Sequence, residues 1–145
     1  MISRSLTFLP FHNMPFSRRT GGGRFQVFES AGTIAAGDIV QFNESGEAVV
    51  GATNKGVIGI AVNAATSSTQ VTVDVFYPGE EVNATISAGT MSASEIGQDA
   101  DFADENDLTL TESNSDFRIL GWDGVSTNKC HGVFTKLVYA GVGAE

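Results

Sequence analysis

The chain has 145 residues, enough for one domain with a sizeable core, or for one domain plus an appendage. Charged residues make up only 17% of it and glycine occurs 17 times, a composition typical of turn-rich β structure. One cysteine, Cys130, excludes a framework of disulfides, and no apolar run approaches the roughly 20 residues that span a bilayer, so we expect no membrane partner.

The net charge of −9 is divided unevenly along the chain. Residues 1–28 contain four arginines and no acid, whereas residues 29–145 contain four basic and seventeen acidic residues. The charge therefore changes from +4 to −13 near residue 28, which indicates two regions of different physical character. We expect an extended N-terminal arm over residues 1–23 and a β body over residues 24–145.

The predicted arm combines aromatic and basic side chains with residues that disfavour helix. Pro10 and Pro15 argue against both a signal peptide and the amphipathic helix of a transit peptide. Three consecutive glycines at residues 21–23 predict a flexible joint. Because the arm has too few neighbours to bury its phenylalanines, we predict that it becomes ordered on another protein. The residues predicted to bind that partner are Phe8, Phe11, Phe16, Arg18, Arg19 and Arg24.

The body is predicted to consist of short strands separated by turns. Asn43-Glu44-Ser45-Gly46 is a good hairpin turn, and residues 57–62 carry no charge, as suits a strand buried on both faces. The predicted strands cover residues 25–28, 39–42, 47–50, 57–62, 71–77, 82–86, 108–111, 117–122 and 133–139. The predicted core positions are Ile58, Ile60, Val73, Val75, Leu120 and Leu137.

Three blocks of the body recur in the same order. Thr33–Gly37 returns as Thr85–Gly89, Val57–Ile60 recurs in kind as Ile119–Trp122, and Val71–Gly79 resembles Val133–Gly141. The pattern predicts two similar β-units, at about residues 33–79 and 85–141, with the extra length of the second in the acidic segment 95–107. Each unit alone would be marginal, so we expect the two to pack together in an all-β fold, a small β-barrel or β-sandwich.

The residues offer no convincing catalytic arrangement. Cys130 and His131 are neighbours, and neighbouring side chains of an extended strand point to opposite faces. The other histidine, His12, lies on the predicted arm. Because an activated nucleophile needs a positioned base, we predict no catalytic residues and no enzymatic activity.

The acidic segment 95–107 holds six acids and no base, which invites a calcium interpretation. An EF-hand loop that started at Asp101 would place Ala103 at the third position and Asn106 where glycine is needed, so that match fails. A looser calcium site stays open, but we favour a solvated loop with no metal and no cofactor. Nucleic acid is also disfavoured, because four arginines are few and the acidic body would repel phosphates.

The order of turns and strands over residues 31–141 carries a resemblance. Turn blocks such as Ala35-Ala36-Gly37-Asp38 and Ser87-Ala88-Gly89-Thr90 precede small-residue strands such as Gly56–Ala61, and alternating strands follow. This order resembles the decoration, or cement, proteins of tailed bacteriophage heads. The resemblance implies a compact β body, often a homo-trimer, that binds the major capsid protein at the outer surface of the virion. It further implies that the protein bridges capsomers and stabilises the capsid.

Two other classes of protein are compatible with the same pattern. One is another virion component, such as a head-fibre base or a tail part. The other is a β-barrel module that binds a glycan or a small ligand. Glycan binding would call for exposed aromatic clusters, and the candidates are only Trp122, Tyr77 and Tyr139.

Overall fold

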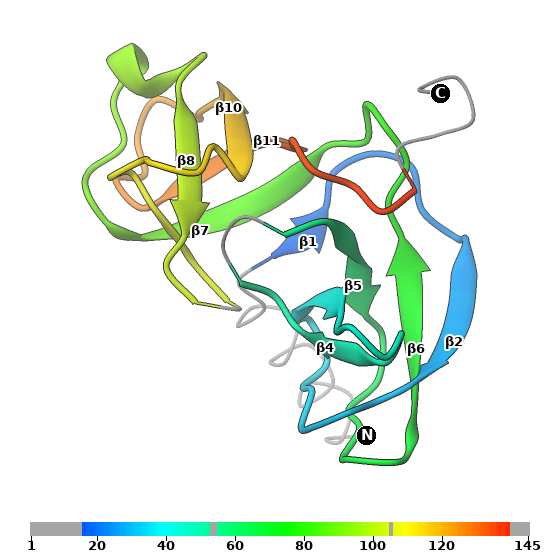
Figure 1. Ribbon diagram of the computed structural model, residues 1–145. Helices are drawn as coiled ribbons and strands as arrows, with labels where there is room; N and C mark the ends of the chain where they lie inside the picture. The colour runs from blue at the N-terminus through cyan, green and yellow to red at the C-terminus, as the bar shows by residue number, and fades with distance from the viewer. Residues whose placement is uncertain (1–15, 53–54, 105, 140–145) are drawn as a thin grey trace, which may run out of the picture.

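Short strands dominate the computed structural model, which describes residues 16–52, 55–104 and 106–139 (Figure 1). The elements are β1 (Ser17–Arg18), β2 (Phe25–Glu29), β3 (Ile39–Phe42), β4 (Ala48–Val50), β5 (Val57–Ala61), β6 (Gln70–Val75), β7 (Val82–Ala88), the 3-10 turn η1 (Ala93–Glu95), β8 (Asp99–Phe102), β9 (Leu108–Thr109), β10 (Phe117–Gly121) and β11 (Lys129–Phe134). The predicted all-β fold is confirmed.

The first barrel is built from β2 to β6. Its strands lie in the order β2-β6-β5-β3-β4, with every neighbouring pair antiparallel. A parallel bridge between Ser30 and Ala48 brings β4 back to the end of β2 and closes the ring. β6 buries Val71, Val73 and Val75 at every second position, as the alternation of a strand requires.

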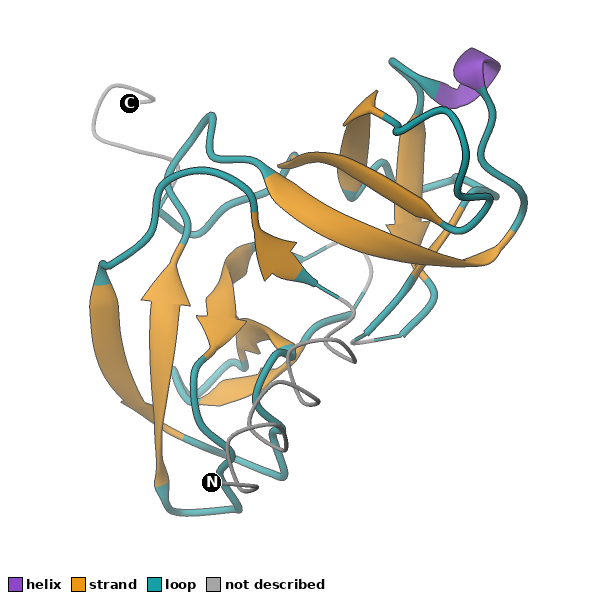
Figure 2. Cartoon of the chain, turned by 180° about the vertical axis from the view of Figure 1, so that it is seen from behind, coloured by secondary structure: helices purple, strands orange, loops and turns teal. Residues whose placement is uncertain are grey.

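The second barrel is built from β7 to β11. Its strands lie in the order β7-β11-β10-β8-β9, and β9 pairs in parallel with β7 to close the ring. β1 adds to β7 from outside this ring, and Figure 1 shows it between the two barrels. Seen from behind, the short 3-10 turn lies at the far end of the second barrel (Figure 2).

The prediction of two similar β-units is confirmed by the topology. The two barrels have the same strand order, the same strand directions and the same parallel closure, with β2 to β6 equivalent to β7 to β11. Gly37 and Gly97 precede β3 and β8 with φ values of 95° and 90°, a left-handed conformation that favours glycine. Their N–H groups donate to the carbonyls of Ala61 and Ile119 in equivalent strands.

The predicted register of the repeat is wrong, although the repeat exists. β6 and β11 are the equivalent strands and bury residues in the same alternation, so Val75 corresponds to Phe134. The predicted match paired Val71–Gly79, most of which is strand β6, with Val133–Gly141. That second segment leaves the barrel after Phe134, and its last two residues lie outside the described ones. Likewise Gly37 corresponds to Gly97 and not to Gly89. Sequences rich in Val, Ala and Gly supply such chance matches.

The acidic segment, expected as a solvated loop, contains strand β8. Asp101 is buried there and its carboxylate accepts N–H bonds from Ser113 and Asn114. The equivalent residue of the first barrel, Gln41, is also buried and exchanges hydrogen bonds with the backbone of Ala52. In each barrel a buried polar side chain therefore holds the equivalent loop by hydrogen bonds to its backbone. A carboxylate can do this as well as an amide when backbone N–H donors surround it.

A group of phenylalanine rings joins the two barrels around Phe134. The centroid of the Phe134 ring lies 5.6 Å from that of Phe76 in the first barrel, and 5.5 Å and 5.0 Å from those of Phe102 and Phe117 in the second. Phe16, from the N-terminal segment, lies 5.7 Å away. Aromatic pairs at such separations contribute beyond their buried area, so this cluster holds the molecule together.

The predicted core residues are mostly confirmed. Four are buried as expected: Ile58, Ile60, Val73 and Val75. Leu137 is half-buried and packs against the core that the barrels share. The prediction for Leu120 is wrong: its side chain is 44% exposed, because the alternation of β10 turns Phe117 and Ile119 to the core instead.

Replacing Phe134 by alanine removes the ring that contacts both barrels, and we expect a loss of about 3–5 kcal/mol in the free energy of unfolding. Leu120→Ala on the neighbouring strand is the matched control, with an expected loss below about 1 kcal/mol. Urea titration followed by fluorescence measures both. Equal losses for the two variants would contradict the placement of Phe134 at the centre of the core.

Candidate functional site

Residues 16–24, which we call the strap, cross from one barrel to the other. Phe16 is fully buried in the shared core. β1 then pairs with the edge of β7, placing Ser17 opposite Asn83 and Arg18 opposite Val82. The strap therefore belongs to the folded body.

Arg18 fastens the strap by contacts with the first barrel. Its Nε donates to Asp74 Oδ2 at 3.0 Å and its Nη1 to Glu80 Oε1 at 3.0 Å. The guanidinium carbon lies 4.8 Å from the centroid of the Phe76 ring. All three charged side chains are less than 20% exposed, so solvent screens the attraction little.

The other arginines of the strap also have partners within the chain. Arg19 Nε lies 3.2 Å from Glu81 Oε1 at a more exposed position. Arg24 pairs with Glu80, and its guanidinium lies 4.3 Å from the centroid of the Tyr77 ring. Tyr77 in turn stacks on Tyr139. Tyr77 therefore packs against both Arg24 and Tyr139.

The structure thus separates the six predicted partner-binding residues. Phe8 and Phe11 lie outside the described residues. Phe16 and Arg18 are enclosed by the body, so in this structure they are not available to a partner. Arg19 and Arg24 keep exposed fractions of 48% and 41% beside their intramolecular partners. The structure places the end of any free arm before Phe16, where the sequence placed it after residue 23.

The glycines of residues 21–23 form a defined bend. All three have φ values between 74° and 113°, the left-handed region. A Cβ at Gly21 would lie within 3.0 Å of the side chain of Glu80. These glycines let the chain turn closely over the ion pairs of Arg18. The sequence had predicted a flexible joint here.

Cys130 and His131 do not form a nucleophile and base. The Cys130 side chain is buried in the shared core, and this burial raises the pKa of its thiol to about 12. His131 lies on the opposite face of β11, with Nε2 4.0 Å from Glu81 Oε1. A thiol that stays protonated and has no base beside it is unreactive.

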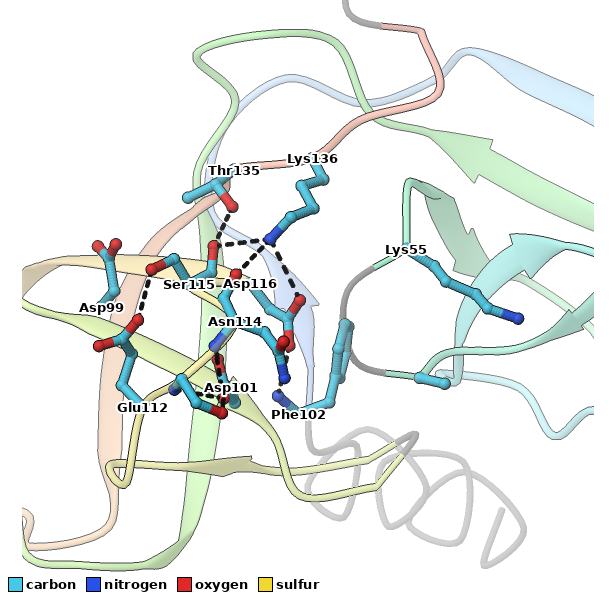
Figure 3. A network of polar contacts seen from close by, with 12 residues as sticks. Lys55, Asp99, Asp101, Phe102, Glu112, Asn114, Ser115, Asp116, Thr135 and Lys136 are labelled. Carbon is cyan, nitrogen blue, oxygen red and sulfur yellow. Dashed lines mark hydrogen bonds and ion pairs between the residues drawn. The ribbon is translucent and has the colours of Figure 1, made fainter.

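A network of polar contacts lies where the chain leaves β11 (Figure 3). Lys136 Nζ donates to the carbonyls of Asn114 and Ser115 and lies 3.6 Å from Asp116 Oδ1. Asp116 also accepts the N–H of Phe102. This network anchors the segment after β11, whose backbone then pairs with Val57 of the first barrel. Its groups satisfy one another, so it acts as a structural connection.

Among the described residues, no group of three or more His, Cys, Asp or Glu side chains could hold a metal ion. The described residues contain no helix long and apolar enough to cross a membrane.

Comparison with known proteins gives a match over the N-terminal half of the described residues. Residues 16–76 match the family model described as phage cement protein. The expected resemblance to phage cement proteins is confirmed over these residues. The matched residues, which we call the cement segment, comprise the strap and the complete first barrel, so the second barrel lies outside the match. No curated protein matches the chain.

The match associates the cement segment with a structural role at a phage capsid. Phage cement proteins are structural proteins.

Arg18→Ala should destabilise the protein by about 2–4 kcal/mol, because it leaves the enclosed carboxylate of Asp74 without its cation and Glu80 with Arg24 alone. Arg19→Ala is the control on the adjacent residue, and its exposed pair should contribute less than about 1 kcal/mol. Thermal and urea unfolding measure the difference. If Arg18→Ala unfolds like the unmodified chain, the strap is not held by this arginine.

Cys130 should resist alkylation in the folded protein, because its thiol is buried and its raised pKa keeps it protonated. At pH 8 we expect iodoacetamide to modify it at least about a hundredfold more slowly than the same chain in urea, given the drop in the thiolate fraction. Mass spectrometry of timed samples follows the reaction. Rapid modification of the folded chain would show that this part of β11 opens.

Proposed function

We propose that the protein binds the outside of an assembled phage capsid, bridges neighbouring capsomers of the major capsid protein and thereby stabilises the shell. The observation that carries the proposal is the match of the strap and first barrel to the phage cement proteins. A compact β body suits such a role, because a protein that binds an assembled lattice needs a complementary surface and no chemistry.

The stabilisation follows from mass action. A ligand that binds the assembled shell and not its separated subunits shifts the equilibrium toward the shell by its own binding free energy. Each copy needs only a modest interface when many copies decorate one particle.

The N-terminal residues before the strap are proposed as one attachment device. Residues 1–15 contain Phe8, Phe11 and Arg4 and no acid, whereas the body is strongly acidic. Apolar anchors flanked by a positive charge are typical of interface hot spots. Arg19 and Arg24, which stay partly exposed, add positive charge at the start of the body.

We also propose that the protein acts as a homo-trimer, the arrangement that the resemblance implies. Three bodies would present three N-terminal segments to one junction between capsomers. Sedimentation of the free protein and image reconstruction of decorated capsids test this arrangement. A monomer both in solution and on the particle would contradict it.

Deleting residues 1–15 should weaken binding to capsids while the melting temperature stays close to that of the full chain, because the contacts of Phe16 and Arg18 remain. Deleting residues 1–23 should lower the melting temperature as well, since the strap is lost. Co-sedimentation with capsids of the same phage that lack this protein, together with calorimetry, separates the two effects. Unchanged affinity of the shorter deletion would exclude the N-terminal segment as an attachment device.

A further inference from the structure

The two barrels differ at one equivalent edge. β2 pairs with β6 as β7 pairs with β11: Phe28 lies opposite Val71, and Ala84 lies opposite Cys130. In the second barrel the other edge of β7 is filled by β1 near Asn83 and by β9 near Ile86. In the first barrel only Ser30, just beyond β2, is bridged on that side among the described residues.

The free edge presents a row of backbone hydrogen-bonding groups. The bonds from Val75 N to Arg24 O and from Ser30 N to Thr69 O show that even-numbered residues of this segment bond to β6. In an antiparallel pair the intervening residues point their N–H and C=O groups away from the partner. Phe25, Val27 and Glu29 therefore direct their backbone groups to the open side.

The side chains beside this edge are apolar and exposed. Phe25 is 59% exposed and Val27 is 53% exposed. Val27 lies opposite Thr72, whose carbonyl accepts the N–H of Val62, another exposed valine. At the equivalent positions of the second barrel, beside the edge that is filled, the residues are polar: Glu81 and Asn83.

β2 also lacks the devices that protect edge strands. It contains no lysine, no proline and no bulge, and its only charge is Glu29 at one end. An unprotected edge of this kind is a template for another strand. The same fold shows that a strand fits there, because the strap occupies the equivalent edge of β7.

We propose that an extended segment of the major capsid protein adds to β2 as a strand and covers Phe25 and Val27. This inference rests on the proposed function and names the surface that the capsid contacts. The matching segment would have apolar residues at alternate positions, to extend the row of Phe25 and Val27, and no acid opposite Glu29. Main-chain bonds to Phe25, Val27 and Glu29 would supply affinity, and the alternating side chains would supply specificity.

One observation favours the capsid protein over a second copy of this chain as the occupant. The cement segment, which is the part of the chain matched by the phage cement family, contains the barrel with the open edge and not the barrel with the filled one.

Val27→Pro tests the main-chain pairing directly. Proline removes the outward N–H of Val27 without removing a bond to β6, and edge strands tolerate proline when that N–H faces solvent. Val27→Ala is the matched control, because it trims the side chain and keeps the N–H. The measurement is co-sedimentation of each full-length variant with capsids that lack this protein, over a range of concentrations.

We expect Val27→Pro to bind at least about tenfold more weakly than Val27→Ala, the loss that one or two main-chain hydrogen bonds produce. Hydrogen exchange on the unmodified chain gives a second readout that does not depend on the folding of a variant. Capsid binding should protect the amides of Phe25, Val27 and Glu29, which exchange in the free protein.

Three results would overturn the inference in distinguishable ways. Equal binding of the two variants, with those amides still exchanging on the particle, would mean that the capsid contacts another surface while the proposed function stands. A free protein that sediments as a dimer, and that Val27→Pro turns into a monomer, would assign the edge to a second copy. Failure of the unmodified chain to bind capsids would contradict the proposed function itself.

Discussion

The packing of Phe134 against rings from three parts of the chain is the interaction on which the rest of the structure depends. The strands of both barrels have seven residues or fewer, and a barrel of such short strands encloses little apolar volume. The two barrels share one larger core. Ile39, Val57 and Ile60 of the first barrel belong to the same apolar cluster as Phe102 and Phe117 of the second. The strap adds Phe16 to that cluster. Stability is therefore a property of both barrels together.

Much of the fold could be predicted from local pattern. The alternation of Val71, Val73 and Val75 and the apolar run at residues 57–61 gave the strands of the first barrel, because a half-buried or buried strand leaves these marks in sequence. The pattern failed at β8, where the buried Asp101 looks like a solvated acid until its backbone donors are known. It also failed in the register of the repeat, since equivalent positions such as Val75 and Phe134 share burial but not residue type.

The candidate binding surface was less accessible to sequence reasoning. The change of charge sign near residue 28 is real, but charge alone does not reveal whether a cation's partner lies in another molecule or farther along the same chain. Arg18 meets its carboxylates at separations of 56 and 62 residues. The open edge of β2 has no signature in the sequence, because Phe25 and Val27 alternate with other residues as in any strand. Their exposure becomes meaningful only when the second barrel shows the same edge occupied.

The strap imposes an order of events during synthesis. β1 pairs with β7, and Phe16 packs on Phe134, so the residues of the strap leave the ribosome more than a hundred residues ahead of their last partner. At ordinary translation speeds that interval is on the order of ten seconds. The first barrel has all of its strands well before then, whereas β1 has no strand to pair with until β7 emerges. The nascent chain thus exposes Phe16 throughout the interval, and the completed protein becomes locked only when its final strand arrives.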